Sequence, residues 1–379
     1  MKWTWLTCSL LSLPASLLLS SCQKNLDRVL PSANETLMEF ATKKDHPLKD
    51  LKDFVQVNLV GDNDEYEPLH TDPTLINAWG LVFPTSGPAW VNGFGSGQSF
   101  IFTADGTAAR PPVNIPTHAA ATGGHPTGIV FNTTTDFKLA NGAAARFIFA
   151  QADGIISAWN GTNNATKMAD DSSGEVYLGL AQASVNGNNF LYAANFSQGK
   201  IDVYDGNWNK ISKRFVDPYL PRGFVPLNIQ NIDGKLFVMY GKPGTGSDVI
   251  SHRNGFVDIF NADGSFVKRF ASQGRLNAPW GITKAPQGFL AQNGGGNDKK
   301  QDGQGVLLVS NFGDGYINAF TTEGEPLGPL RSHGRPIEIE GLWGIAFAPA
   351  TSISADHNTL FFAAGPGGEK HGLFGSIKR

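Results

Sequence analysis

One spacing recurs along the chain and constrains its fold more than any other feature. In each instance a glycine is followed five residues later by an aromatic or aliphatic residue. The six glycines are Gly97, Gly154, Gly199, Gly255, Gly315 and Gly372. The surrounding runs are short, rich in β-branched and aromatic residues, and cut by Gly and Asn. Such runs predict antiparallel strands joined by tight turns.

A second motif precedes the first in every unit. It places an aromatic or small residue before Gly and then Ile or Leu, and it is clear at Trp79-Gly80-Leu81, Thr127-Gly128-Ile129, Trp280-Gly281-Ile282 and Trp343-Gly344-Ile345. It is weaker at Leu178-Gly179-Leu180, and at Leu227-Asn228-Ile229 an Asn replaces the glycine. Successive motifs lie about 50 residues apart, a period typical of repeat architectures.

Six units of this kind predict an all-β, six-bladed β-propeller, because radial stacking of small sheets covers both faces of each one. The last unit is shorter than the others, so we expect it to lack a strand. The alternating run 54–60 precedes the first unit and is the expected donor, which would join both chain ends in one blade. The alternative is a set of β-sandwiches with coincidental glycine spacing. The repeated internal spacing favours the propeller.

The first residues predict export and lipid anchoring. Lys2 provides a positive start, Leu6–Leu19 an apolar core, and Leu19-Ser20-Ser21-Cys22 resembles the lipobox of bacterial lipoproteins. The resemblance implies a signal peptide over 1–21, acylation of Cys22, a flexible tether over 22–52 and a propeller over 53–379. Gln23 after the acylated residue implies the outer membrane of the bacterial cell envelope. The alternative is an ordinary signal peptide cut elsewhere.

Composition narrows the classes of function and of site that the chain can have. Charged residues make up 17% of the chain, the net charge is −3, and no Lys/Arg cluster is present, so we expect no nucleic-acid partner. Both cysteines, Cys8 and Cys22, lie in the leader region. No disulfide framework or thiolate metal site is therefore expected in the propeller.

The tryptophans of the second motif are the first candidates for ligand binding. Because the innermost strand of a blade starts near one face, Trp79, Trp280 and Trp343 would ring the mouth of the central channel. Aromatic platforms of this kind bind sugars and other flat ligands by stacking. In the structural alternative, each tryptophan wedges between blades while its glycine permits close backbone approach.

Repeated amides and one His-rich loop are the next candidates. Asn195 and Asn311 occupy the same phase of their units, and Asn228 replaces a glycine, so their amides would bind ligand hydroxyls or Ca²⁺; the alternative is a turn-forming role. His118 and His125 would face the channel as a metal-binding or acid–base pair, although the spacing is a weak metal signal. No cofactor is predicted apart from this Ca²⁺. The loop 294–303 lacks the Ca²⁺-loop pattern and reads as a hydrophilic insertion.

Several runs together resemble one family. Asn77-Ala78-Trp79-Gly80-Leu81, Ala193-Ala194-Asn195-Phe196, Asn254-Gly255-Phe256-Val257-Asp258 and Asn311-Phe312-Gly313-Asp314-Gly315 resemble uncharacterised secreted bacterial β-propellers, which are distantly similar to NHL-repeat proteins. The resemblance covers nearly the whole predicted domain. It implies the fold and implies no activity, so it leaves the mechanism open.

Three classes of function remain, and no catalytic residue is predicted. The first is a non-catalytic module that binds a small molecule, a saccharide or a protein. The second is a metal-dependent hydrolase resembling gluconolactonases, with Asn195 or Asn228 as a ligand, although Glu65 and Glu67 precede the first unit instead of lying in its inner strand. The third is a quinone-dependent sugar dehydrogenase, for which Arg222, Arg253 and Arg275 form no recognisable motif. The sequence favours the binding module.

Overall fold

The computed structural model describes residues 51–244, 254–286, 288–290 and 305–379. The predicted signal peptide, Cys22, nearly all of the predicted tether, Arg253 and the insertion 294–303 lie outside these residues. Within the described part, no helix has the length and apolar character needed to cross a membrane.

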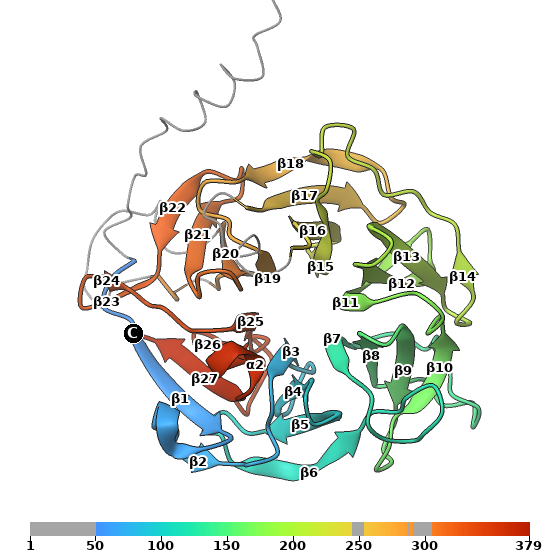
Figure 1. Cartoon of the computed structure of the whole chain (residues 1–379), viewed down its shortest axis with the longest axis horizontal. Coiled ribbons are helices and arrows are strands. Elements are labelled where there is room, and N and C mark those ends of the chain that lie inside the picture. The colour runs from blue at the N-terminus through green and yellow to red at the C-terminus, as the bar shows by residue number, and fades with distance from the viewer. Residues whose placement is uncertain (1–50, 245–253, 287, 291–304) are drawn as a thin grey trace, which may run out of the picture. The chain divides into compact units, whose positions relative to one another are not determined.

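Six sheets surround a common axis, as Figure 1 shows, and the predicted six-bladed β-propeller is confirmed. Blade 1 consists of β3 (Ala78–Val82), β4 (Ala89–Gly93), β5 (Gln98–Phe102) and β6 (Ala108–Asn114). Blade 2 consists of β7 (Pro126–Phe131), β8 (Phe147–Gln151), β9 (Ile155–Trp159) and β10 (Thr166–Asp170). Blade 3 consists of β11 (Tyr177–Val185), β12 (Asn188–Asn195), β13 (Lys200–Asp205) and β14 (Lys210–Ile211). Blade 4 consists of β15 (Val225–Ile232), β16 (Lys235–Gly241), β17 (Phe256–Asn261) and β18 (Phe266–Ser272). Blade 5 consists of β19 (Pro279–Lys284), β20 (Val306–Asn311), β21 (Ile317–Thr321) and β22 (Pro326–Pro329).

Blade 6 contains both ends of the described chain. Its strands run from the axis outward as β25 (Leu342–Phe347), β26 (Leu360–Ala364), β27 (Leu373–Lys378), β1 (Val55–Gly61) and β2 (His70–Thr71). Strand β1 pairs antiparallel with β27, with Val55 opposite Lys378 and Gly61 opposite Leu373. The predicted closure of the last blade by an N-terminal strand is therefore confirmed.

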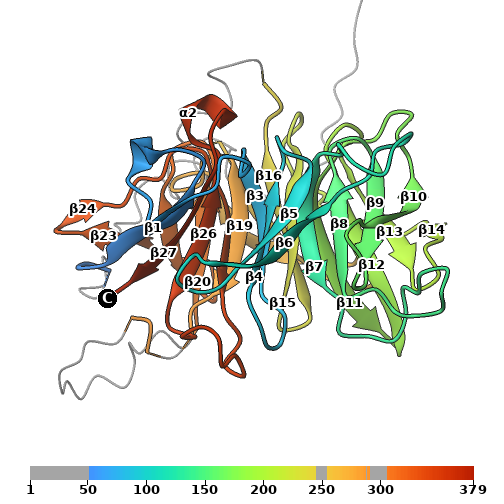
Figure 2. The ribbon, with the colours of Figure 1, turned by 90° about the horizontal axis from the view of Figure 1, so that it is seen from below.

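Small elements decorate the ring. A 3-10 turn, η1 (Asp64–Tyr66), precedes β2, and the hairpin β23 (Arg331–Ser332) and β24 (Arg335–Pro336) precedes blade 6. The short helix α2 (Pro366–Glu369) connects β26 to β27 and lies at one face of the ring in the side view of Figure 2. We call this the upper face. The turns from each second strand to each third strand lie at the same end of the blades.

The repeated glycine spacing marks the third strand of every blade. Each of the six glycines lies just before β5, β9, β13, β17, β21 or β27. The residue five positions later is buried in each case, in the set Phe102, Trp159, Tyr204, Phe260, Phe320 and Ile377. Gly97 and Gly154 have φ values of 68° and 75°, in the left-handed region that glycine adopts without strain. The motif thus encodes a tight turn followed by an interblade anchor.

The second motif marks a β-bulge in every innermost strand. The register shifts are Ala78/Leu81 in β3, Pro126/Ile129 in β7, Tyr177/Gly179 in β11, Pro226/Asn228 in β15, Pro279/Ile282 in β19 and Leu342/Ile345 in β25. A Cβ on Gly80 would lie 2.2 Å from the carbonyl oxygen of Thr127 in the next blade, and one on Gly344 would lie 2.6 Å from that of Trp79. The glycines therefore allow neighbouring innermost strands to touch, as the structural alternative for this motif predicted.

We expect Gly80→Ala to destabilise the ring by about 2–3 kcal/mol, because its Cβ would overlap backbone that cannot move without shifting blade 2. Urea unfolding of the full chain measures the free energy of unfolding. Gly174→Ala is the matched control, since a Cβ there meets no atom within 4 Å, and its effect should stay within about 0.5 kcal/mol. Equal effects at the two positions would show that close strand approach does not limit stability.

Candidate functional site

Three tryptophans fill the axis of the ring near its upper face. Trp79, Trp280 and Trp343 are 5%, 3% and 6% exposed, and they come from β3, β19 and β25. Trp79 and Trp343 stack with ring centroids 3.6 Å apart, and the ring of Trp280 meets both edge-on at 6.2 and 5.9 Å. The three rings pack against one another as a plug, and they do not surround an open mouth. Their predicted ligand role remains a prediction, and very little of their surface reaches solvent.

Three phenylalanines lie over this plug and are partly exposed. Phe94 stacks on Trp79 with a centroid distance of 5.1 Å, Phe312 stacks on Trp343 at 4.0 Å, and Phe196 packs against the same cluster. Each one follows the second strand of its blade, in blades 1, 3 and 5. These phenylalanines escaped the sequence analysis as site residues, although Asn195-Phe196 and Asn311-Phe312 share a pattern that could have revealed them. We call this surface the aromatic floor.

A small cavity lies among the innermost strands. It measures about 20 Å³ and is lined in part by Asn228, Gln230 and Trp280. A space of this size holds about one water molecule. The indole nitrogen of Trp79 donates to the side-chain oxygen of Asn77 at 2.8 Å. The indole nitrogens of Trp280 and Trp343 are buried and have no hydrogen-bond partner among the described residues.

The three predicted asparagines are held by separate partners. The Asn228 amide nitrogen donates to the Trp280 carbonyl at 2.8 Å, and that of Asn311 donates to the Arg275 carbonyl at 2.7 Å. The Asn195 amide nitrogen donates to the Asp202 carboxylate at 2.6 Å. Each amide therefore stabilises its own blade junction or strand end. The structure does not bring them together around one point, and their predicted ligand role remains a prediction.

The two predicted histidines also have different surroundings. His125 is exposed, and its ring lies 5.1 Å from that of Phe94 at the edge of the aromatic floor. The Nδ1 atom of His118 instead lies 2.8 Å from the Asp170 carboxylate at the end of β10. The two imidazoles contact different parts of the propeller, so they form no direct pair. His125 remains a candidate at the rim of the floor.

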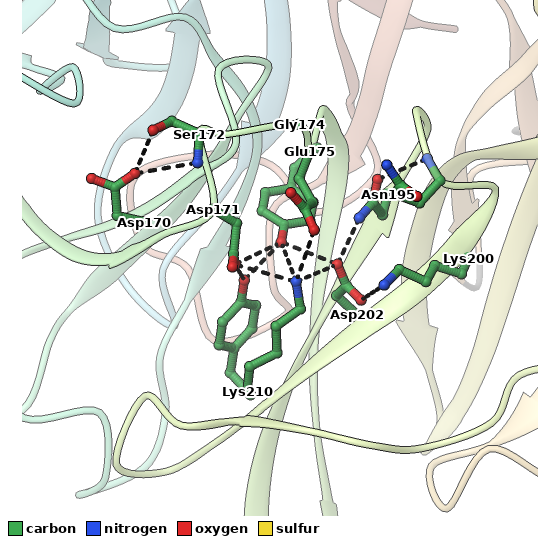
Figure 3. A network of polar contacts seen from close by, with 12 residues as sticks. Asp170, Asp171, Ser172, Gly174, Glu175, Asn195, Lys200, Asp202 and Lys210 are labelled. Carbon is green, nitrogen blue, oxygen red and sulfur yellow. Dashed lines mark hydrogen bonds and ion pairs between the residues drawn. The ribbon is translucent and has the colours of Figure 1, made fainter.

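A dense polar network occupies blade 3 next to Asn195, as Figure 3 shows. The Lys210 ammonium, from the outermost strand β14, lies 2.9 Å from Asp202 and 3.4 Å from Asp171. It also lies 3.5 Å from Glu175 and 3.2 Å from the Tyr177 hydroxyl. One partly exposed cation thus lies among three carboxylates. Among the described residues, no group of three or more His, Cys, Asp or Glu side chains is placed to hold a metal ion.

The network fixes the charge of its members. Burial would raise the pKa of Asp202, but hydrogen bonds from Lys210, Asn195 and Lys200 outweigh burial and hold that pKa below its usual value. Burial would lower the pKa of Lys210, and the bond to Asp202 raises it instead. Burial and neighbouring acids raise the pKa of Tyr177 and of Tyr204. Asp202 therefore stays ionised and the two phenols stay neutral across the physiological range.

In blade 4, Asp258 occupies the repeat position equivalent to Asp202, but its pKa shifts in the opposite direction. Asp258 is fully buried, and it shares the guanidinium of Arg269 with the buried carboxylate of Asp217. Burial raises the pKa of Asp258 to about 7; Arg269 opposes this rise, and Asp217 adds to it. One guanidinium forms ion pairs with two carboxylates here, whereas in blade 3 both Lys200 and Lys210 form ion pairs with Asp202. Asp258 therefore titrates near neutrality.

Comparison with known proteins gives two kinds of likeness. One relative is an uncharacterised protein of Acanthamoeba polyphaga mimivirus, 33% identical over 344 residues that cover 85% of this chain and 80% of the viral protein. A second uncharacterised protein of the same virus is 31% identical over 342 residues, covering 85% of both chains. The chain belongs to the family of these viral proteins. No family model matches it.

Both relatives are viral proteins, so the expected bacterial origin stays a prediction. Among solved structures, virginiamycin B lyase from Staphylococcus aureus has a TM-score of 0.50 and 14% sequence identity, with 86% of this chain and 99% of the lyase covered. At this identity the likeness concerns the fold alone. The resemblance to NHL-repeat proteins likewise stays a prediction.

We expect Asp258→Asn and Asp202→Asn to change stability with opposite pH dependence. Between pH 3.8 and about 7 the unfolded chain releases the Asp258 proton while the folded chain keeps it, so rising pH destabilises the native protein. Removing that titration should make Asp258→Asn more stable than the native chain by about 2–4 kcal/mol at pH 8, with little difference near pH 4. Urea unfolding across this pH range measures the difference.

The Asp202→Asn variant is the comparison, because Asp202 occupies the same position in its repeat as Asp258. The depressed pKa of Asp202 means that its carboxylate stabilises the fold above the usual carboxyl range, and that this stabilisation is lost as the pH falls. The variant should be less stable than the native chain at pH 7, and the gap should close in acid. Parallel pH profiles for the two variants would contradict the assigned environments.

Proposed function

We propose that this chain is a non-catalytic binding module, lipid-anchored in the cell envelope, whose aromatic floor holds a ligand with a flat apolar face. The supporting observation is the aromatic plug, which closes the axis and presents the partly exposed rings of Phe94, Phe196 and Phe312 at the upper face. Flat aromatic surfaces recognise sugar rings and aromatic groups by stacking. His125 and the exposed polar turns around the floor would supply directional contacts.

Rigidity of the floor supports the proposal. Side chains bond to backbone carbonyls in the innermost strand of the next blade. Asn92 of β4 donates to the Thr127 carbonyl at 3.0 Å, Thr127 of β7 to the Tyr177 carbonyl at 2.7 Å, and Ser310 of β20 to the Trp343 carbonyl at 2.6 Å. These bonds are buried, where a lost partner costs about 1–3 kcal/mol. The floor is thus pre-organised, so binding a ligand requires little ordering of the protein.

The alternative, a metal-dependent hydrolase, requires Asn195 or Asn228 to act as a ligand of the metal ion, for example Ca²⁺. A metal would bind the amide oxygens, and the Asn195 oxygen already accepts from the Ser197 hydroxyl and the Gln198 backbone amide, at 3.0 and 3.1 Å. The Asn228 oxygen accepts from the Ile229 backbone amide at 2.8 Å, so a metal at either position would compete with existing bonds. We therefore favour binding over hydrolysis, and Ca²⁺ remains a secondary proposal.

Phe196→Ala should weaken binding at the floor by about fivefold to tenfold, since an aromatic contact contributes about 1 kcal/mol. The probes are neutral saccharides and aromatic small molecules, tested by saturation-transfer NMR on the full chain. Tyr219→Ala is the matched control, because this aromatic residue is 80% exposed on the loop between blades 3 and 4. Equal loss in both variants, or no loss in Phe196→Ala, would place binding elsewhere.

Cys22→Ser should release the protein from membranes, because acylation requires the thiol and two or more acyl chains give stable anchoring. Detergent phase partitioning and labelling with a fatty-acid analogue measure the anchor. Cys8→Ser is the control and should leave both readouts unchanged. A native protein that stays in the aqueous phase without label would contradict the lipobox assignment.

A further inference from the structure

A polar cleft lies at the opposite end of β12 from Phe196. It measures about 470 Å³, within the range of small-molecule sites, and is lined by Asp136, Asn188, Asn189, Phe190, Asp205, Gly206, Asn207 and Ile211. Its walls are the loop between β7 and β8 in blade 2 and two hairpin turns of blade 3. The cleft is therefore separate from the aromatic floor, and any activity here goes beyond the proposed function.

Direct bonds hold the walls of the cleft in place. The Phe137 amide donates to the Gly206 carbonyl at 2.8 Å, and the Trp208 indole donates to the Lys138 carbonyl at 2.9 Å. A Cβ on Gly206 would lie 2.8 Å from the Asp136 carboxylate, so only glycine permits this approach. Both contacts join blade 2 to blade 3. The cleft is thus formed before any ligand arrives.

Two carboxylates in the cleft are oriented by other groups. The Asn189 amide nitrogen donates to Asp136 at 2.8 Å, and the Asn189 oxygen accepts from the Ser184 hydroxyl at 2.5 Å. The Asp205 carboxylate accepts from the backbone amides of Asn207 and Asn209, both at 2.9 Å, and from the Asn209 side-chain nitrogen at 3.1 Å. Because a carboxylate has about four acceptor sites, these bonds fix both carboxylates and leave most of the free acceptor capacity on Asp136.

The cleft carries more amide side chains than its hairpin turn requires for folding. The turn between β11 and β12 uses left-handed φ angles of 49° at Asn186 and 78° at Gly187. An Asn-Gly pair of this kind is sufficient for a two-residue hairpin. Asn188 and Asn189 belong to β12, and the Asn207 side chain makes no hydrogen bond among the described residues. The Asn188 amide nitrogen donates to the Asn186 carbonyl at 3.3 Å and both polar atoms of the Asn189 amide are bonded, so the Asn207 amide is the one most open to a ligand.

We propose that this cleft binds a neutral saccharide. Carboxylate acceptors beside amides that both donate and accept match the vicinal hydroxyls of a sugar ring. Phe190 and Ile211 supply the apolar part of the lining. The Lys213 ammonium already lies 3.5 Å from the Phe190 ring centre, and it opposes a second cation there. A neutral polyol therefore fits this combination better than a metal ion does.

Saturation-transfer NMR of the full chain with glucose, galactose, mannose, N-acetylglucosamine and their disaccharides tests the site. We expect at least one sugar to bind, with affinity reduced about tenfold or more in Asp136→Ala, since hydrogen bonds to charged groups are the strong ones. Asn207→Ala should also weaken binding, by about threefold to tenfold. This second variant breaks no bond of its side chain within the described protein, so loss of folding cannot explain its effect.

Asp233→Asn and Phe196→Ala are the controls. Asp233 is an exposed acid in the corresponding hairpin of blade 4, and Phe196 belongs to the aromatic floor. Neither should change sugar affinity at the cleft. Sugar binding lost only in Phe196→Ala would overturn the cleft and support the floor. Absence of binding to every sugar would overturn the proposal, and so would a rise in Tm with CaCl₂ alone that Asp136→Ala abolishes, because that result identifies a cation site.

Discussion

Contact between the backbones of neighbouring innermost strands is the constraint on which the ring depends. The repeated bulges bend these strands, and glycine at the bulge removes the side chain that would hold the blades apart. Where Asn228 replaces glycine, its amide turns the same contact into a hydrogen bond to the Trp280 carbonyl. The tryptophans then meet at the axis because the strands that carry them lie so close. The tryptophan plug and the aromatic floor are consequences of this close contact between strands.

Charge is distributed unevenly around a ring that is otherwise regular. Asp202 and Asp258 occupy one phase of adjacent blades, yet the first has two lysines and the second shares one arginine. Each blade has therefore kept the backbone of the repeat while changing the polar partners at its buried third strand. Function on such a scaffold resides in these local substitutions and in the turns, since the shared fold supports many unrelated activities.

The sequence predicted the architecture well because the fold is periodic. Equal glycine spacing specified the third strands, and the short last unit together with residues 54–60 specified the closing strand. The site was less predictable. A bulge changes the direction of the side chains around it, so the position of Trp79 in its strand did not reveal that its ring turns inward. The blade 3 network joins Lys210 of the outermost strand to Asp171 from a preceding loop, a contact that no local pattern encodes.

The pairing of β1 with β27 has a consequence for the biogenesis of the protein. These strands lie near opposite ends of the described chain, so the ring cannot close until β27 has left the ribosome. Until then both flanks of the unfinished sheet stack expose unpaired backbone and apolar side chains, which favours association with other chains. A protein stopped before β27 would lack the partner of its own first strand. Synthesis of β27 and ring closure are therefore coupled steps, and chaperones that shield open sheet edges would act before the ring closes.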